Sequence, residues 1–250
     1  MKILLQIRYD GTDFHGYQVQ QNARTVQGEF NLACLKLFGC ECDVTGCSRT
    51  DSGVHALSFW LTVSRRDGKA ITIPTDRIPT AFNSVLPSDI SVTYAKKVED
   101  LFHPRYDVKE KEYLYLINTN EIQDPFLRNY SYHLSRSITP NQIDNMNNAA
   151  SFLVGEHDFA SFMSEGSNVQ STVRTIYKAE FVLNDKMLEF RISANGFLYN
   201  MVRIIVGTLL DIGIKNISPD EIKTILKKKN RSFAASTAPA QGLYLSRVEY

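Results

Sequence analysis

Two kinds of hydrophobic spacing alternate along this chain and predict a mixture of strands and helices. Residues 3–9 form an apolar-rich run of strand length that ends at the turn signal Asp10-Gly11. After Thr25, a candidate N-cap, apolar residues recur on one helical face until Gly39, so a helix is predicted between them. Alternating or β-friendly segments predict three further strands, at residues 58–63, 91–95 and 111–118.

The second half of the chain repeats this mixture. Residues 139–142 (TPNQ) have the composition of a capping box with proline at the first helical position. A β-hairpin is predicted around Asn184-Asp185, and residues 197–212 are apolar on most sides, as in a buried helix. A capped helix is predicted from residue 218 to the lysines at 227–229, followed by a closing strand over 243–250.

These elements favour an α+β fold with antiparallel sheet, because strands and helices do not alternate as they do in a βαβ nucleotide-binding fold. The 250 residues are enough for one to two domains at ~150 residues each. No long linker rich in proline, glycine or serine separates the halves. We therefore expect two domains that share one continuous sheet or a tight interface.

Composition changes the picture mainly through charge. Charged residues make up 22% and hydrophobic residues 43% of the chain, which excludes a disordered or coiled-coil protein. Lysine plus arginine number 28 and aspartate plus glutamate 27, a formal charge of +1, so any nucleic-acid affinity must come from a local basic surface. The candidate basic positions are Arg24, Arg65, Arg66, Arg105, Lys109, Lys111 and residues 227–231.

The sequence predicts a cytoplasmic protein with no membrane partner. Its least polar stretch, residues 204–210, is far shorter than the ~20 residues of a membrane span, and the apolar run at the start is too short for a signal peptide. Four cysteines occur without a C-x-x-C pair or zinc-ligand spacing beside the histidines. We expect reduced structural thiols and no bound metal.

The residues from Gly46 to Ala56 are the strongest candidate for chemistry. Two glycines bracket small polar residues, one arginine and one aspartate, the composition of a rigid functional loop. By composition alone, the favoured interpretation of this segment is a surface turn in which Asp51 forms an Asx turn. The alternative is a reactive carboxylate at Asp51, kept ionised by Arg49 or another cation.

Several motifs, in order, resemble the TruA-type tRNA pseudouridine synthases almost from end to end. Each alone is a weak signal, but their order along the chain is specific. They are residues 49–56 (RTDSGVHA), 9–18 (YDGTDFHGYQ), 25–28 (TVQG), 102–103 (FH), 111–113 (KEY), 171–176 (STVRTI), 200–207 (NMVRIIVG) and 242–245 (GLYL).

The resemblance implies an isomerase that converts uridine to pseudouridine at positions 38, 39 and 40 of the tRNA anticodon stem-loop. It implies a homodimer, no cofactor and no metal, which agrees with the lack of a P-loop or G-x-G-x-x-G run. It also implies two similar α/β halves whose antiparallel sheets join into one extended mixed sheet, with helices on one side and a catalytic cleft between the halves. We expect an N-terminal catalytic-loop domain over 1–105 and a C-terminal domain over 106–250 that completes the cleft.

The resemblance also assigns roles to four residues. Asp51 matches the essential aspartate; attack on the base, attack on the ribose and assistance of an elimination all remain open, and each requires an ionised carboxylate. Arg203 matches an active-site arginine that would keep Asp51 charged. An unpaired arginine within an apolar helix is costly, so the alternative to this pairing is a side chain that extends to solvent. Tyr113 matches a tyrosine that stacks on the flipped base, although its pattern alone fits a core aromatic. Arg49 resembles an arginine that assists base extrusion and contacts phosphate.

The chain departs from the family pattern at residues 104, 106 and 107, where proline, tyrosine and aspartate stand in place of the more usual alanine, phenylalanine and serine. The added acid beside Arg105 puts the breadth of substrate positions in doubt. Two alternatives remain: the same chemistry on another RNA uridine, and a non-catalytic RNA-binding protein on the same fold. A glycosidase is disfavoured because that chemistry usually needs two carboxyl groups.

Overall fold

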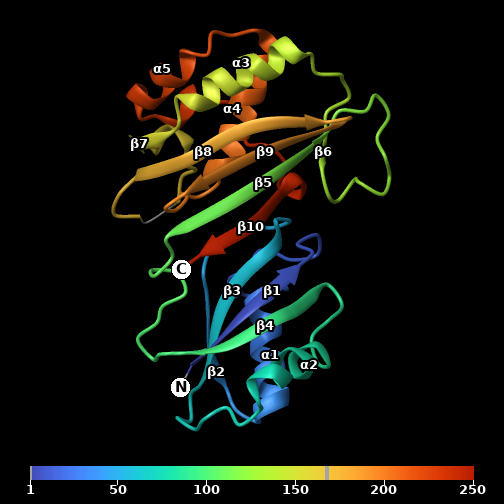
Figure 1. The fold of residues 1–250 in the computed structure, drawn as a ribbon, viewed down its shortest axis with the longest axis vertical. Coiled ribbons are helices and arrows are strands. Elements are labelled where there is room, and N and C mark those ends of the chain that lie inside the picture. Colours follow the sequence, from blue (N-terminus) through green and yellow to red (C-terminus); the bar gives the residue numbers. More distant parts are fainter. Residues whose placement is uncertain (1, 167–168) are drawn as a thin grey trace. The chain divides into compact units, whose positions relative to one another are not determined.

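The computed structural model describes residues 2–166 and 169–250, and these residues form ten strands and five α-helices. They divide into two compact units (Figure 1). The N-terminal unit contains residues 1–109 and 244–250, and the C-terminal unit contains residues 110–243. The C-terminal strand thus returns to the first unit. The predicted domain division between residues 105 and 106 stays a prediction.

The N-terminal unit is a mixed sheet with two helices. Its strands hydrogen-bond in the order β4-β1-β3, and successive stretches of the outer edge of β3 pair with β10 in parallel and with β2 in antiparallel orientation. The elements are β1 (Lys2–Tyr9), α1 (Val26–Phe38), β2 (Cys42–Gly46), β3 (His55–Arg65), α2 (Ile78–Asn83), β4 (Ile90–Val98) and β10 (Leu243–Glu249).

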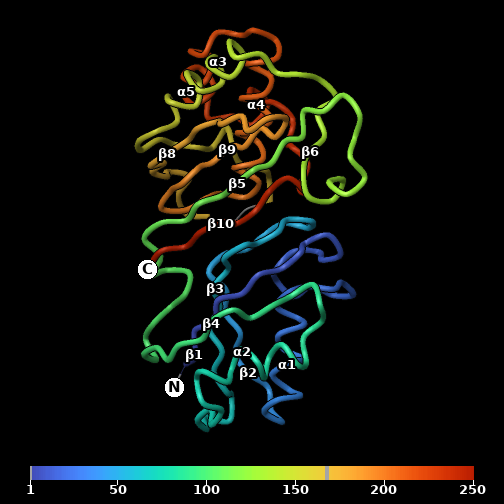
Figure 2. The backbone as a smooth tube through the Cα atoms, turned by 45° about the vertical axis from the view of Figure 1, so that its right-hand side comes forward, coloured from blue at the N-terminus to red at the C-terminus, as the bar shows by residue number. Residues whose placement is uncertain are grey.

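Local sequence signals explain the boundaries of α1. The Thr25 side chain accepts a hydrogen bond from the Gly28 N–H, and the helix ends at Gly39, whose φ of 66° lies in the left-handed region that glycine tolerates. Helices α1 and α2 lie together on one side of the strands (Figure 2), where Phe30 and Phe82 bring their ring centroids to 5.7 Å. The predicted helix between Thr25 and Gly39 is confirmed.

The C-terminal unit has a second sheet and three helices. Its strands pair in antiparallel order β5-β9-β8-β7, with the short β6 parallel to β5. The elements are β5 (Glu110–Asn118), β6 (Tyr132–His133), α3 (Pro140–Ser151), β7 (Gly155–Asp158), β8 (Val173–Asn184), β9 (Met187–Ala194), α4 (Met201–Lys215) and α5 (Glu221–Lys228). The predicted hairpin turn lies between β8 and β9, with Asp185 at a positive φ of 56°.

Helix α4 forms much of this unit's core but begins later than its apolar pattern indicates. A helix was expected from residue 197, yet Asn200 adopts the left-handed conformation (φ 59°) and α4 starts at Met201. Residues 198–201 instead form a turn in which the Met201 N–H donates to the Leu198 carbonyl. Hydrophobic periodicity does not register such a break, because the residues before it are also apolar.

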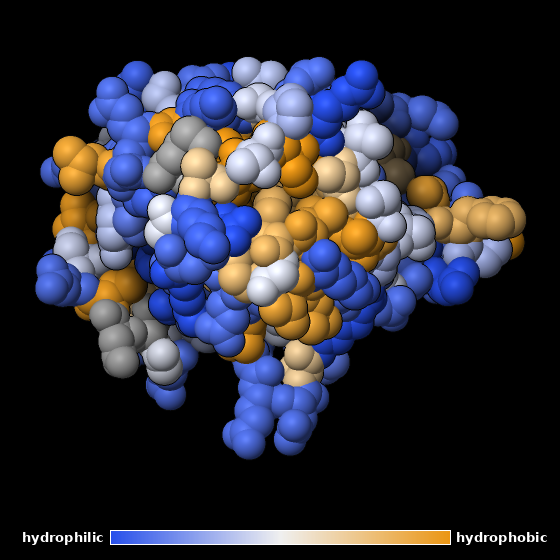
Figure 3. Space-filling view, turned by 90° about the horizontal axis from the view of Figure 1, so that it is seen from below, coloured by the Kyte–Doolittle hydropathy of each residue, from blue (hydrophilic) through white to orange (hydrophobic). Residues whose placement is uncertain are grey.

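The structure confirms the α+β class, with strands that pair in both parallel and antiparallel orientation. The predicted capping box is also present: the Thr139 side chain accepts from the Gln142 N–H, and the Gln142 side chain accepts from the Thr139 N–H. Within the described residues, no helix combines the length and hydropathy needed to cross a membrane. On the face seen in Figure 3, apolar side chains gather near the centre and hydrophilic ones surround them.

Candidate active site

The segment with the predicted catalytic aspartate is a hairpin loop between β2 and β3. Within it, the Val54 N–H donates to the Asp51 carbonyl at 3.2 Å, and Gly53 takes a positive φ of 76°. This closes a tight turn over residues 51–54, which explains the glycine two positions after the aspartate. Asp51 itself is half-buried, whereas Arg49 is exposed.

The loop is held by a second segment, residues 9–17, far from it in the sequence. The Tyr17 N–H donates to the Thr50 carbonyl at 3.2 Å, and the Tyr9 hydroxyl lies 2.8 Å from Thr50 Oγ1. On the other side of Asp51, the Phe14 carbonyl accepts from the Gly53 N–H and the Ser52 hydroxyl, both at 3.2 Å. These bonds flank Asp51 on both sides and fix its backbone.

Two glycines allow this close approach. A Cβ on Gly11 would lie 2.0 Å from the Val54 carbonyl oxygen, and one on Gly16 would lie 2.4 Å from the Thr50 carbonyl oxygen. Gly16 also has a φ of +86°, which side chains rarely adopt. The motif over residues 9–18 therefore serves as a brace for the Asp51 loop.

His55 completes the brace at the start of β3. Its Nδ1 accepts a hydrogen bond from the Gly11 N–H at 2.9 Å and lies 3.2 Å from Asp10 Oδ1. A backbone N–H can only donate, so Nδ1 must offer its lone pair here. The same Asp10 oxygen accepts from the N–H and hydroxyl of Thr12, which offset its charge. The His55 ring also stacks on Tyr244, with centroids 4.7 Å apart.

Arg203 lies in the first turn of α4 and is half-buried. Its Nε donates to the Ala238 carbonyl at 2.7 Å, and its NH1 donates to Asn200 Oδ1 at 2.9 Å. Asn200 in turn donates to the Ser164 hydroxyl at 2.9 Å. Backbone and side-chain acceptors therefore hold the guanidinium in one orientation, so it does not simply extend along the helix to solvent.

The positive charge of Arg203 also acts on Tyr115, a buried tyrosine of β5. Burial raises the pKa of the Tyr115 hydroxyl, and the nearby guanidinium partly offsets that rise. The hydroxyl donates to the Pro239 carbonyl at 2.7 Å, next to the Ala238 carbonyl that Arg203 uses. Residues 238–239 thus tie α4 to β5.

Tyr113 is a buried residue of β5, 6% exposed, and its ring meets the edge of Phe197 at a centroid distance of 5.1 Å. This environment is that of a core aromatic, the interpretation that its pattern alone favoured. Arg49 and Asp51 share one loop of the N-terminal unit, whereas Tyr113 and Arg203 belong to the C-terminal unit. That the four residues form one pocket stays a prediction.

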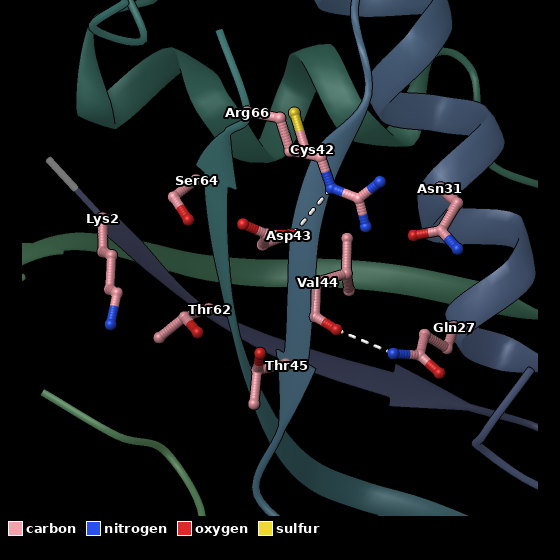
Figure 4. Close-up of a pocket in the computed structure, with 10 residues that line it drawn as sticks. All are labelled: Lys2, Gln27, Asn31, Cys42, Asp43, Val44, Thr45, Thr62, Ser64 and Arg66. Atoms are coloured by element: carbon pink, nitrogen blue, oxygen red, sulfur yellow. Dashed lines mark hydrogen bonds and ion pairs between the residues drawn. The ribbon is translucent and has the colours of Figure 1, made fainter. Parts of the chain in front are cut away.

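A cavity of about 350 Å³ in the N-terminal unit lies elsewhere, around β2 (Figure 4). Its lining is mostly polar, and two of its contacts are internal: Arg66 pairs with Asp43, and Gln27 donates to the Val44 carbonyl. None of the predicted site residues lines it. Among the described residues, no group of three or more His, Cys, Asp or Glu side chains is arranged to hold a metal ion.

Comparison with known protein families shows the class of this protein. A family profile described as tRNA pseudouridine synthase matches residues 6–107 and 149–250, most of the chain. The chain therefore belongs to the tRNA pseudouridine synthase family, and the predicted enzyme class, an isomerase that modifies tRNA, is confirmed.

Curated relatives agree with this assignment over their whole length. A protein of Thermoanaerobacter sp. (strain X514), named tRNA pseudouridine synthase A, is 47% identical over 248 residues, which cover 99% of each chain. A protein of the same name from Bacillus subtilis (strain 168) is 44% identical over 252 residues, covering 100% of this chain and 99% of the relative.

The sequence indicates the loop but not the residues that hold it. Tyr9, Thr50 and His55 were recognised only as parts of motifs, with no structural role assigned. The available signal was the pair Gly11 and Gly16 beside an aromatic residue, since glycine is needed where one backbone segment approaches another. Their partners could not be deduced, because about 40 residues separate the two segments.

Proposed function

We propose that this enzyme converts uridines 38, 39 and 40 of the tRNA anticodon stem-loop to pseudouridine and that Asp51 is its catalytic carboxylate. The reaction breaks the bond between N1 of uracil and C1′ of ribose and forms a bond between C5 and C1′. The proton leaves C5, and N1 gains one, so no oxidant or external group is needed. The enzyme must hold one ionised carboxylate in a fixed position while the base turns.

The observation that supports Asp51 most directly is the bracing of its loop. Hydrogen bonds from residues 9–17 fix the backbone on both sides of Asp51, while its side chain stays half-buried. A loop that only reversed the chain would need no such support from a distant segment. Catalytic groups, in contrast, must be held within a fraction of an ångström of their working position.

Arg49 and Arg203 are the cations that we assign to this reaction. Arg49 is exposed, and no carboxylate among the described residues forms an ion pair with it, so it is available to a phosphate of the extruded nucleotide. Arg203 is oriented by Ala238 and Asn200, and we propose that it keeps Asp51 ionised. Tyr113 would stack on the flipped uracil, which loses its neighbours when it leaves the helix. The enzyme would act as a homodimer in the cytoplasm.

Loss of Asp51 tests the catalytic assignment. Asp51→Ala and the isosteric Asp51→Asn should abolish tritium release from tRNA that carries [5-³H]uridine, while binding of the tRNA stays within a few-fold of wild type. The matched control is Asp67→Asn, which removes a carboxylate from another loop of the same unit. Turnover by Asp51→Ala at the wild-type rate would contradict the role of Asp51.

The substrate positions need a separate measurement. Transcripts of an anticodon arm with uridine at only one of positions 38, 39 or 40 should each acquire pseudouridine, detected by carbodiimide modification and primer extension. A transcript lacking uridine at all three should acquire none. Modification of uridines elsewhere in the tRNA, with none at these positions, would keep the chemistry and overturn the proposed target.

A further inference from the structure

One face of the N-terminal sheet carries exposed aromatic and basic side chains. Opposite residues on paired strands point to the same face, and in this register Tyr94 of β4 lies beside Gln6 of β1, which lies beside Trp60 of β3. Lys96 pairs in the same way with Leu4. Strand alternation places Arg8 on this face too, two residues beyond Gln6.

The other face of the same strands is the helix-covered core. Ile3, Leu5 and Ile7 alternate with the residues above and are at most 1% exposed. Helices α1 and α2 lie on only one side of these strands (Figure 2), so the face with Tyr94 carries no helix of this unit. It is instead partly covered by Tyr250 and Phe102, whose rings pack 5.1 Å apart beside Trp60.

Tyr94 is held in place while half of it remains open to solvent. Its ring meets Trp60 edge to face at a centroid distance of 6.2 Å and an interplanar angle of 78°. Trp60 is fixed in turn by Tyr250, with centroids 6.0 Å apart. Tyr94 nevertheless remains 49% exposed. A ring that is already ordered loses little conformational entropy when a planar ligand stacks on it.

The charged residues of these strands are all basic. Strands β1, β3 and β4 contain Lys2, Arg8, Arg65, Lys96 and Lys97 but no aspartate or glutamate. Among the described residues, neither Arg8 nor Lys96 has a carboxylate within ion-pair distance, and both are exposed. The Lys96 ammonium lies 5.9 Å from the Trp60 ring centre, and the Arg8 Nε donates to the Leu57 carbonyl. Positive charge therefore borders Tyr94 without internal neutralisation.

Three of the basic residues selected from the sequence behave differently. Arg24 makes two hydrogen bonds to Asp89 and one to Glu29, Arg65 pairs with Asp67, and Arg66 pairs with Glu41 and Asp43. An arginine that is already paired with carboxylates contributes little to attraction of a polyanion. The local basic surface that the near-zero net charge requires must therefore use residues other than these three arginines.

We propose that this face binds an unpaired nucleotide of the RNA substrate, with its base stacked on Tyr94 and the adjoining phosphates contacting Lys96 and Arg8. An aromatic ring flanked by cations is the arrangement with which proteins bind single-stranded nucleic acid, because every base has a face to stack and every linkage a negative charge. The proposal rests on the proposed function, since it takes the substrate to be RNA. It adds a contact surface that the catalytic residues do not provide.

Stacking is tested by Tyr94→Ala and Tyr94→Phe. The alanine variant should raise the Kd for a tRNA transcript by about 5-fold or more, the range expected for loss of one base–aromatic stack, while the phenylalanine variant keeps wild-type affinity. The matched control is Tyr177→Ala on β8, which is 47% exposed and precedes Lys178, a lysine paired with Glu180. It should leave the Kd unchanged. Thermal unfolding of each variant checks that the fold is intact.

The phosphate contact is tested by salt dependence. Lys96→Gln should reduce the slope of log Kd against log salt by about 1, as expected for one lost phosphate contact. Lys178→Gln, the control from β8, should leave the slope unchanged. Binding of an acidic peptide by the same face, lost in Tyr94→Ala while tRNA binding persists, would overturn the choice of RNA as ligand.

The outcomes separate this proposal from the proposed function. The proposal that this face binds a nucleotide is wrong if Tyr94→Ala binds tRNA as wild type does, or if Tyr177→Ala weakens binding equally. Pseudouridine formation would continue in either case, so the proposed function would stand. If wild-type protein forms no pseudouridine at positions 38 to 40 but Tyr94→Ala still weakens RNA binding, the binding face stands and the target assignment is wrong.

Discussion

The central strands of the two units differ in how they handle charge. Strands β1, β3 and β4 of the N-terminal unit carry five lysines and arginines and no acid. Strands β5, β8 and β9 of the C-terminal unit carry four of each sign, and Arg191 bridges Glu112 and Glu189 among them. A sheet that neutralises its own charges needs no ionic partner, whereas cations without a paired carboxylate, such as Arg8 and Lys96, favour binding of an anionic ligand.

The units also differ in how they support the predicted site residues. Asp51 lies in a loop that a distant loop braces through backbone hydrogen bonds. Tyr113 and Arg203 lie on a strand and a helix, whose own hydrogen bonds already set their backbones. The loop depends on close backbone contact, so a single added methyl group should disturb it more than it would disturb either regular element.

The largest effect is expected for Gly11→Ala. Its new Cβ would lie 2.0 Å from the Val54 carbonyl oxygen, so the brace must move away from the loop. We expect a loss of about 3 kcal/mol in the free energy of unfolding and a fall in turnover, because the Asp51 backbone loses its support. Urea unfolding and tritium release measure the two effects.

The control for this change is Gly39→Ala at the end of α1. Its added Cβ meets no atom within 4 Å, so only the positive φ of 66° is strained. The cost should be about 1 kcal/mol, with unchanged turnover per folded molecule. Equal losses of turnover in the two variants would contradict the importance of the brace.

An intermediate effect is expected for the two threonine caps, one in each unit. Thr25 caps α1 from a buried position, 2% exposed, and Thr139 caps α3. Thr25→Ala should cost about 2 kcal/mol and Thr139→Ala about 1 kcal/mol, because the N–H that Thr25 satisfies has less access to replacement water. Thr→Ser at each position retains the oxygen and should restore most of the stability in urea unfolding. A larger loss for Thr139→Ala would reverse this comparison.

The smallest effect is expected from Asp158 in the C-terminal unit. A hydrogen bond from Thr172, helped by Lys229, lowers the pKa of the Asp158 carboxyl below its ordinary 3.8. Because the pKa of this carboxyl is lower in the folded state, its ionised form stabilises the protein at pH values above its ordinary pKa. That stabilisation is lost as the pH falls through the pKa of the folded state. Asp158→Asn should therefore cost about 1 kcal/mol at pH 7 and progressively less below pH ~4.

Asp67 of the N-terminal unit provides the comparison. Arg65 lowers the pKa of its carboxyl to about 2, but Asp67 is exposed in the turn that follows β3. Exposed ion pairs contribute little because solvent and salt screen them. Asp67→Asn should leave the unfolding midpoint unchanged across the same pH range, and a shift as large as that of Asp158→Asn would contradict this distinction.

Local signals were sufficient for most elements of this fold. The Thr25 cap, the Gly39 stop, the Thr139 capping box and the hairpin at Asn184-Asp185 each depend on residues within a few positions of one another. Such interactions form within one turn of chain, so the sequence displays them directly. Helix α4 was predicted too early because the left-handed break at Asn200 leaves the apolar pattern unchanged.

The sequence by itself determined the α+β class, most of the helices and strands and, through resemblance, the family and the choice of the Asp51 loop as the candidate site. Only the tertiary structure decided what holds that loop, which arginines are neutralised internally and which face of the N-terminal sheet stays open. These properties depend on residues far apart in the chain, such as Tyr9 with Thr50 and Arg24 with Asp89. Charge count and periodicity record which residues are present, but burial and ion pairing depend on where folding brings them.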